Sequence, residues 1–213
     1  MATTAGDVPR RRGRPVGFER LPALDALVEL FWREGYDGAT QEAMLASTGL
    51  SSSSLYRTFG TKDATFAAVL ERYLELADGM LGPLERGGDG TAELQAFLDR
   101  VRDQLGGPMG AAGCLVLGTL CDPVNRSVEI DALTRRHVER MLAALRTAVE
   151  RAAAAGDSLP IGSPATADVL LAGVLGVLTR ARGNPAAALA LLDGLRALVP
   201  ARMPAFRDPG AFS

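Results

Sequence analysis

Apolar residues recur at helical spacing along most of the chain. The first clear set consists of Leu24, Leu27, Val28 and Phe31, at positions i, i+3, i+4 and i+7. This spacing places them on one face of an α-helix, which is predicted over about residues 18–34. The sequence contains no alternating apolar and polar pattern of the kind that marks a half-buried strand. The predicted fold class is therefore all-α.

Two short helices are predicted next. Thr40 is a suitable N-cap for the first, and Ser51 is a suitable N-cap for the second. Leu55 and Phe59 are four residues apart and lie on one face of this second helix, at residues 52–59. Together with the first helix, these elements have the dimensions of a helix-turn-helix domain in which residues 52–59 form the reading helix. The serine run could instead be a flexible linker, but its apolar neighbours at core spacing favour the helix.

Longer helices are predicted in the rest of the chain, giving about nine in all. The fourth follows Thr61 and is expected to end near Leu81, because Gly82 and Pro83 come next. The later helices are predicted at about residues 91–105 with Thr91 as N-cap, 111–121, 127–155, 165–182 and 185–198. The domains are then an arm at 1–16, a helix-turn-helix domain at 17–62, a connecting helix at 63–81, a helical domain at 82–204 and a tail at 205–213.

Positive charge is concentrated at the amino terminus. Residues 1–20 contain five arginines against Asp7 and Glu19, a net charge of +3, whereas residues 63–213 carry 15 basic and 18 acidic side chains. Such a basic arm suits contact with a polyanion, because each phosphate that is neutralised releases counterions. The alternative is a disordered tail that has no partner.

Uninterrupted apolar runs are short in this sequence. The longest, residues 111–121 and 169–178, are below the ~18–20 residues that span a bilayer, so no transmembrane helix is expected. No apolar stretch follows the arginines near the amino terminus, so no signal peptide is visible. The expected location is the cytoplasm.

A dense series of motifs lies between Gly17 and Leu76. It comprises Ala23-Leu24-Asp25-Ala26-Leu27, Leu30-Phe31-Trp32-Arg33-Glu34-Gly35-Tyr36-Asp37-Gly38-Ala39-Thr40, Thr48-Gly49-Leu50-Ser51, Leu55-Tyr56-Arg57-Thr58-Phe59-Gly60-Thr61-Lys62-Asp63 and Phe66. The series resembles the DNA-binding domain of TetR-family transcriptional regulators. Farther along, Gly113-Cys114-Leu115-Val116 before a long helix is similar to one branch of that family's second domain. The resemblance implies a ligand-responsive repressor that binds a pseudo-palindromic operator as a homodimer.

The resemblance also implies roles on double-stranded DNA. Arg57 would read a base, since a guanidinium can bond to the O6 and N7 atoms of guanine. Phosphate contacts are implied for Thr40, Gln41, Tyr56 and Lys62. The small side chains of Ser51, Ser52, Ser53 and Ser54 let backbone N–H groups approach a phosphate. The arm residues Arg10, Arg11, Arg12 and Arg14 would lie in a minor groove or along the DNA backbone.

The second domain implied by the resemblance binds a small molecule and forms the dimer. Mostly apolar residues are assigned to its ligand pocket: Met80, Leu81, Leu98, Val101, Leu115, Leu120, His137, Met141 and Leu145. The dimer interface is assigned to Val174, Leu175, Leu178, Ala188, Leu191, Leu192 and Leu195. Residues 169–178 are apolar nearly all round, and the glycines at 173 and 176 favour a closely packed neighbouring helix. The alternatives are a packed core without a pocket and a buried core within a monomer.

The sequence gives little support to enzyme chemistry. No nucleophile-elbow motif, phosphate loop or metal-ligand spacing is present, so no catalytic residue, cofactor or metal is expected. His137, the single histidine, is interpreted as an exposed polar residue or as part of the pocket. Cys114 and Cys121 are interpreted as buried small hydrophobes rather than a thiol switch. Two other classes stay open: a DNA-binding dimer without a ligand, and a helical carrier or enzyme that does not bind DNA.

Overall fold

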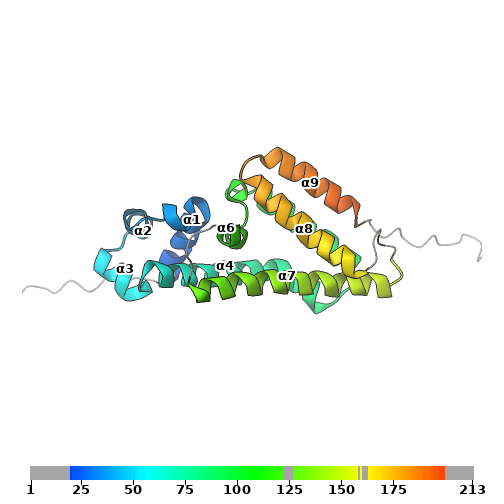
Figure 1. Ribbon diagram of the computed structural model, residues 1–213, viewed down its shortest axis with the longest axis horizontal. Helices are drawn as coiled ribbons and strands as arrows, with labels where there is room; N and C mark the ends of the chain where they lie inside the picture. Colours follow the sequence, from blue (N-terminus) through cyan, green and yellow to red (C-terminus); the bar gives the residue numbers. More distant parts are fainter. Residues whose placement is uncertain (1–19, 122–126, 158, 160–162, 200–213) are drawn as a thin grey trace, which may run out of the picture.

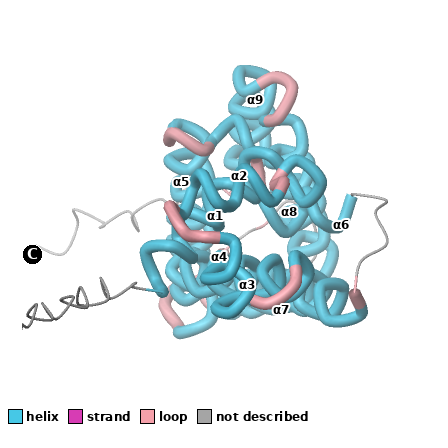
Figure 2. Tube along the Cα trace, turned by 90° about the vertical axis from the view of Figure 1, so that its left-hand side faces the viewer, coloured by secondary structure: helices cyan, strands magenta, loops and turns pink. Residues whose placement is uncertain are grey.

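The computed structural model describes residues 20–121, 127–157, 159 and 163–199. Within these ranges every regular element is helical (Figure 2), which confirms the all-α prediction. The elements are α1 (Arg20–Gly38), α2 (Gln41–Thr48), α3 (Ser52–Phe59), α4 (Lys62–Arg86), α5 (Thr91–Gly106), the 3₁₀ turn η1 (Gly110–Ala112), α6 (Leu115–Cys121), α7 (Val128–Ala154), α8 (Ser163–Ala181) and α9 (Pro185–Ala197).

The helices form an elongated molecule with a small bundle at one end (Figure 1). Helices α1, α2 and α3 make this bundle and rest on the first part of α4. Helices α4 and α7 run side by side along the molecule, and α8 packs on α7 and α9 toward the other end. Helix α6 lies between the two parts and contacts both α1 and α8, so it joins the small bundle to the larger one.

Side-chain caps fix the starts of three helices as the sequence predicts. The hydroxyl oxygens of Thr40, Ser51 and Thr61 accept hydrogen bonds from the backbone N–H groups three residues ahead, at the starts of α2, α3 and α4. In the turn between α2 and α3, Gly49 adopts a left-handed conformation, with φ 66° and ψ 13°. These local signals fix the ends of the two short helices and the turn that joins them.

The predicted break at Gly35 is present, but the first helix does not end there. Gly35 has φ 73° and ψ −177°, which interrupts the helical backbone. One further turn then continues to Gly38. The interruption brings Tyr36 onto Phe66 of α4, with ring centroids 5.2 Å apart, and this contact fixes the end of α1 against α4.

The predicted end of the fourth helix near Leu81 is wrong. Helix α4 continues through Pro83 to Arg86. Because proline has no N–H, it cannot bond to the carbonyl of Gly79 four residues earlier. Arg100 of α5 donates a hydrogen bond from its guanidinium to that carbonyl, at 3.2 Å. A residue distant in sequence therefore satisfies the acceptor that the proline leaves unpaired.

Two further boundaries differ from the prediction. Thr91 is the first residue of α5 and not its cap; Asp89 accepts the hydrogen bond from the backbone N–H of Ala92 instead. The helix expected from residue 111 begins only at Leu115, because a 3₁₀ turn and Gly113, with φ 69°, precede it. The chain therefore changes direction between α5 and α6.

Helix α8 is apolar over a longer stretch than the sequence analysis expected. Among the described residues, Pro164–Ala181 is long and apolar enough by composition to span a membrane, because small residues extend the apolar run that the sequence analysis counted. Its Asp168 pairs with Arg146 of α7 at 3.0 Å. Ala167, Leu170, Val174, Val177, Leu178 and Ala181 are buried on one face at helical spacing. This is the pattern of a helix packed in a protein core.

Candidate DNA-binding surface and helical-domain pockets

The reading helix α3 is held by two side chains that point into the small bundle. Leu55 and Phe59 are buried, as predicted from their spacing. Phe31 of α1 belongs to the same core, and its ring centroid is 4.9 Å from that of Phe66 on α4. The α3 side chains on the opposite face are therefore directed to solvent.

Serine hydroxyls organise the amino-terminal end of α3. Ser51 accepts a hydrogen bond from the backbone N–H of Ser54 and lies 3.2 Å from the hydroxyl of Ser53. Gln41, at the start of α2, donates from its side-chain amide to the Ser52 hydroxyl at 3.0 Å. The serine run is thus an ordered helix start and not a linker. Its bond to Gln41 holds the two helices of the motif together.

The outward face of α3 carries the side chains that the sequence analysis assigned to DNA. Ser53, Tyr56 and Arg57 are exposed, whereas Ser52 and Ser54 are half-buried. The first turn of α3 contains no acidic residue, so the partial positive charge of the helix start is not neutralised there. This face offers hydroxyl and guanidinium groups together with backbone N–H groups, which is the chemistry that recognises phosphates and base edges.

Lys62 is positioned by contacts with α1. Its ammonium lies 4.6 Å from the ring centroid of Tyr36 and donates to the carbonyl of Asp37 at 3.5 Å. The Tyr36 hydroxyl bonds to the Asp63 carboxylate. Burial, followed by the bond to Asp63 and the charge of that carboxylate, raises the pKa of Tyr36 to about 12. Lys62 is therefore a fixed positive charge at the start of α4, beside the reading helix.

The four arm arginines, Arg10, Arg11, Arg12 and Arg14, lie outside the described residues. The first described residue, Arg20, places its guanidinium 5.7 Å from the ring centroid of Phe59. Thr40 and Gln41 are exposed at the start of α2. The structure thus gathers the described members of the predicted DNA-binding set on the α2 and α3 side of the small bundle.

Comparison with known proteins identifies this bundle. The profile described as "Bacterial regulatory proteins, tetR family" matches residues 23–69. The HTH-type transcriptional repressor ComR of Escherichia coli is 40% identical over 76 residues, which are 35% of this chain and 36% of ComR. Residues 23–69 therefore belong to the TetR family. The match to ComR spans just over a third of that relative's length.

Two other proteins match more of the chain. The HTH-type transcriptional repressor BdcR of Escherichia coli is 29% identical over 145 residues, covering 60% of this chain and 72% of BdcR. The solved structure of the TetR-family regulator CifR, a cysteine mutant complexed with operator DNA, has a TM-score of 0.71 at 22% identity and covers 88% of this chain and 100% of CifR. The likeness to CifR shows that the fold extends over the larger bundle as well.

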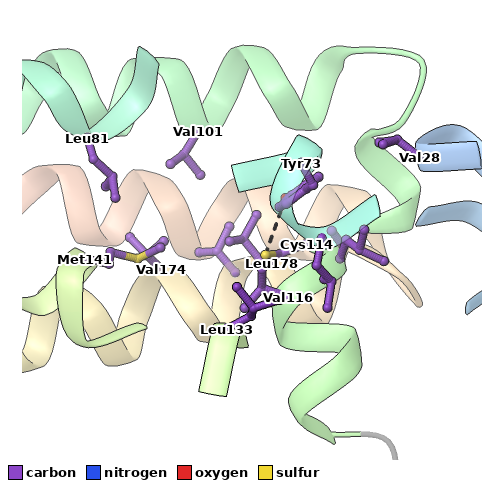
Figure 3. Packing of buried hydrophobic residues seen from close by; sticks show 14 of the residues in the cluster. Val28, Tyr73, Leu81, Val101, Cys114, Val116, Leu133, Met141, Val174 and Leu178 are labelled. Carbon is purple, nitrogen blue, oxygen red and sulfur yellow. Dashed lines mark hydrogen bonds between the residues drawn. The ribbon is translucent and has the colours of Figure 1, made fainter. Parts of the chain in front are cut away.

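The predicted ligand pocket corresponds in part to a small interior cavity between α4, α5, α7 and α8. The cavity measures about 30 Å³, room for about two or three water molecules at ~10–15 Å³ each. Of the predicted residues, Met80, Leu81, Val101, His137 and Met141 line it. Leu98, Leu115, Leu120 and Leu145 do not line it and belong to the packed core or its edge. Figure 3 shows Leu81, Val101, Met141 and Val174 within this region.

His137 is buried and lines this cavity, so its interpretation as an exposed residue is wrong. Burial and, to a smaller degree, the positive charge of Arg140 lower the pKa of His137, while Asp78 opposes the shift. The imidazole is therefore neutral at physiological pH. Helical spacing alone could not reveal this, because α4 and α8 cover the position from elsewhere in the sequence.

The cavity also has polar groups that the sequence analysis missed, namely Tyr73, Gln104 and Cys114. Tyr73 is buried and its hydroxyl donates to the Cys114 sulfur at 3.5 Å (Figure 3). Burial and the neighbouring thiol raise the pKa of Tyr73 well above its usual range, so the hydroxyl stays protonated. Only the tertiary structure brings these three residues together, because they come from three separate segments.

The segment before α6 links this cavity to the small bundle. Trp32 of α1 donates from its indole N–H to the carbonyl of Gly113 at 2.9 Å, and its ring meets that of Tyr73 edge-on at 5.0 Å. Gln104 of α5 also donates to the Gly113 carbonyl, at 3.5 Å. Cavity residues are therefore in direct hydrogen-bond contact with the backbone that holds α1.

A second, larger hollow opens on the surface between α6 and α8. This groove has a volume of about 290 Å³. It is lined by Cys114, Leu117, Gly118, Cys121, Leu178, Thr179 and Arg182. Cys121 is exposed, which corrects the interpretation of both cysteines as buried, whereas Cys114 is buried. The groove and the interior cavity share Cys114 and Leu178, so these two side chains form the wall between them.

Most of the residues predicted for the dimer interface are buried within the single chain. Val174, Leu178, Ala188, Leu192 and Leu195 have almost no exposed surface. Gly173 explains part of this packing, because a Cβ there would lie 2.2 Å from a methyl carbon of Leu195 on α9. The helix that approaches this glycine closely thus belongs to the same chain. Leu175 is half-buried and Leu191 is 40% exposed, so these two still face outward.

Proposed function

We propose that the chain is a DNA-binding transcriptional repressor of the cytoplasm that binds a pseudo-palindromic operator as a homodimer and responds to a small molecule. One observation carries the proposal: α3 presents Ser53, Tyr56 and Arg57 to solvent from a helix that Leu55 and Phe59 anchor in the core. Such a helix can enter the major groove and place its polar side chains against base edges and phosphates.

The relatives support this function. ComR and BdcR are both named as HTH-type transcriptional repressors, and CifR is solved on double-stranded operator DNA. The identity to ComR, 40%, is the highest among these three. We infer that the present chain reads DNA through the same motif.

The outward faces of α8 and α9 support a dimer. Val169 and Leu191 are exposed large hydrophobic side chains on these helices, and Leu175 on α8 is half-buried. Two copies that pack these faces together would form a four-helix bundle related by a two-fold axis. The two reading helices could then contact half-sites about one turn of DNA apart, ~34 Å.

The function is tested by selecting genomic fragments with the purified full chain and footprinting the best fragment at two salt concentrations. We expect a palindromic site protected on two successive major grooves, with affinity well above nonspecific binding. Arg57→Ala is the variant to compare with the unmodified chain, because it removes an exposed side chain of α3 and leaves the core unchanged. Weak, sequence-blind binding by a folded dimer would contradict the proposal and favour a helical carrier or enzyme.

A further inference from the structure

Among the described residues that line the groove between α6 and α8, Arg182 is the one charged side chain. The other described lining residues are apolar, thiol, hydroxyl or glycine, and none of them is a carboxylate. A positive charge in a hollow without an acidic partner favours an anionic ligand. The volume of about 290 Å³ is at the lower end of the ~300–1,000 Å³ that is usual for small-molecule sites.

Arg182 is held in place by the backbone around α6. Its Nε donates to the carbonyl of Ala112 at 2.8 Å. Its guanidinium also lies against Gly118, where a Cβ would come within 2.5 Å of Nη2. Nε is bonded to the protein, while no described residue accepts a hydrogen bond from either Nη nitrogen. A guanidinium fixed in this way can bond to both oxygens of a carboxylate with little loss of entropy.

The other groove residues define the rest of the ligand. Thr179 donates its hydroxyl to the carbonyl of Leu175 at 2.8 Å, so toward a ligand it offers only oxygen lone pairs. Leu117 and Leu178 provide apolar surface, and Cys114 lies between the groove and the interior cavity. An apolar body attached to one anionic group therefore matches this lining better than a sugar or a cation.

We propose that the α6–α8 groove binds a small monocarboxylate with an apolar body, whose carboxylate bonds to the Nη nitrogens of Arg182 and whose body lies against Leu117 and Leu178. The interior cavity of about 30 Å³ cannot hold such a molecule without expanding, whereas the groove can. The site therefore lies on the outer side of the wall formed by Cys114 and Leu178.

The same contacts suggest how the ligand would act on DNA binding, a step that rests on the proposed function. Arg182 bonds to Ala112, and the next carbonyl, of Gly113, accepts the indole N–H of Trp32 on α1. A carboxylate bound to the Nη nitrogens would alter the bond between Nε and the Ala112 carbonyl, and with it the backbone that positions α1. The ligand would thereby favour one of two positions of the small bundle, α1 to α3, relative to the rest of the chain.

The site is tested by calorimetry on the full chain with octanoate as the probe and octanamide as its neutral match. We expect octanoate to bind and octanamide to bind at least tenfold more weakly. Arg182→Gln should lose at least tenfold in octanoate affinity. Arg180→Gln is the matched control, since Arg180 is exposed two residues earlier, near the end of α8, but does not line the groove.

A second variant keeps the arginine but moves it. Gly118→Ala adds a methyl group where Nη2 now lies, and alanine favours the helix, so the fold should persist while the guanidinium shifts. We expect the same loss of octanoate affinity in this variant. In the unmodified chain, octanoate should also slow maleimide labelling of the exposed Cys121. Equal binding by Arg182→Gln, or equal affinity for octanamide, would overturn the site.

Operator release is measured separately, by adding octanoate to the protein bound to its selected DNA fragment. Release that Arg182→Gln abolishes supports the regulatory step. Octanoate binding without any change in operator affinity would overturn that step and leave the site in place. Failure to select a specific DNA fragment would overturn the proposed function. The calorimetric result would still show whether octanoate binds in the groove.

Discussion

Arg57 and Lys62 carry positive charge near the same DNA-binding surface, but their settings differ. Arg57 is exposed on the outward face of α3, whereas Lys62 is fixed over the Tyr36 ring at the start of α4. Arg57→Ala should cost ~1–3 kcal/mol at one base step and relax sequence preference there, because a bidentate base contact is lost. Competition between operators that differ at single positions measures this effect. An unchanged preference would contradict the assignment of Arg57.

Lys62→Ala should instead weaken binding to all sequences alike. A phosphate contact carries no sequence information, so the expected change is a salt slope lower by ~1 with preference retained. Affinity at several salt concentrations, for the operator and for unrelated DNA, provides the measurement. A loss confined to the operator would show that Lys62 contributes to base readout.

His137 should make stability depend on pH near neutrality. Burial lowers its pKa in the folded chain, so the unfolded chain takes up a proton first as pH falls below ~6.5. Stability is therefore fully present above that pH and declines below it, by at most ~1.4 kcal/mol per pH unit. Urea unfolding between pH 7.5 and 5.5 measures the slope. Since the chain has one histidine, His137→Gln should flatten it, and an unchanged slope would refute the assignment.

At the scale of the helices, α4 depends on a contact with α5. Arg100→Gln removes the charged donor to the Gly79 carbonyl and should lower the free energy of unfolding by about 0.5–1.5 kcal/mol. Pro83→Ala restores the missing N–H, so the same change in that background should cost less. Urea unfolding of the two single variants and the double variant gives the coupling. Full additivity would show that Arg100 does not compensate for the proline.

Sequence reasoning succeeded for helix starts and failed for some helix ends. Thr40, Ser51 and Thr61 cap helices through bonds to residues three positions ahead, so the signal is local. The continuation past Pro83 relies on Arg100, which lies 21 residues beyond Gly79. Cavity members such as Tyr73 and Gln104 likewise come together only by tertiary packing. Contacts between residues so far apart in the sequence produce no periodic pattern from which they could be predicted.

For the whole molecule, the decisive prediction concerns the outward faces of α8 and α9. Leu191→Asp places a charge on a 40% exposed position of α9 and should raise the dimer dissociation constant at least tenfold. Leu76→Asp on α4 is the matched control, because Leu76 is also an exposed leucine but lies on another helix. Sedimentation equilibrium measures both variants. A dimer that tolerates Leu191→Asp and not Leu76→Asp would place the interface elsewhere.

The dimer prediction also shows what the spacing of apolar residues cannot determine. The sequence showed that α8 is apolar on more than one side, but it could not tell which apolar residues a partner covers. Val174 and Leu178 face the interior cavity, and Gly173 receives Leu195 of the same chain. Apolar residues on one helix therefore divide between the core of the chain and its outer surface, and only packing assigns them.

Trp32 is the single tryptophan of the chain, and its indole sits at the joint between the two bundles. Its N–H bonds to Gly113, and its ring meets Tyr73 edge-on. Indole fluorescence responds to the polarity and hydrogen bonding around the ring, so the protein contains a built-in optical reporter of this joint. Any event that separates the bundles can be followed by emission from the unlabelled protein, in real time and with or without DNA.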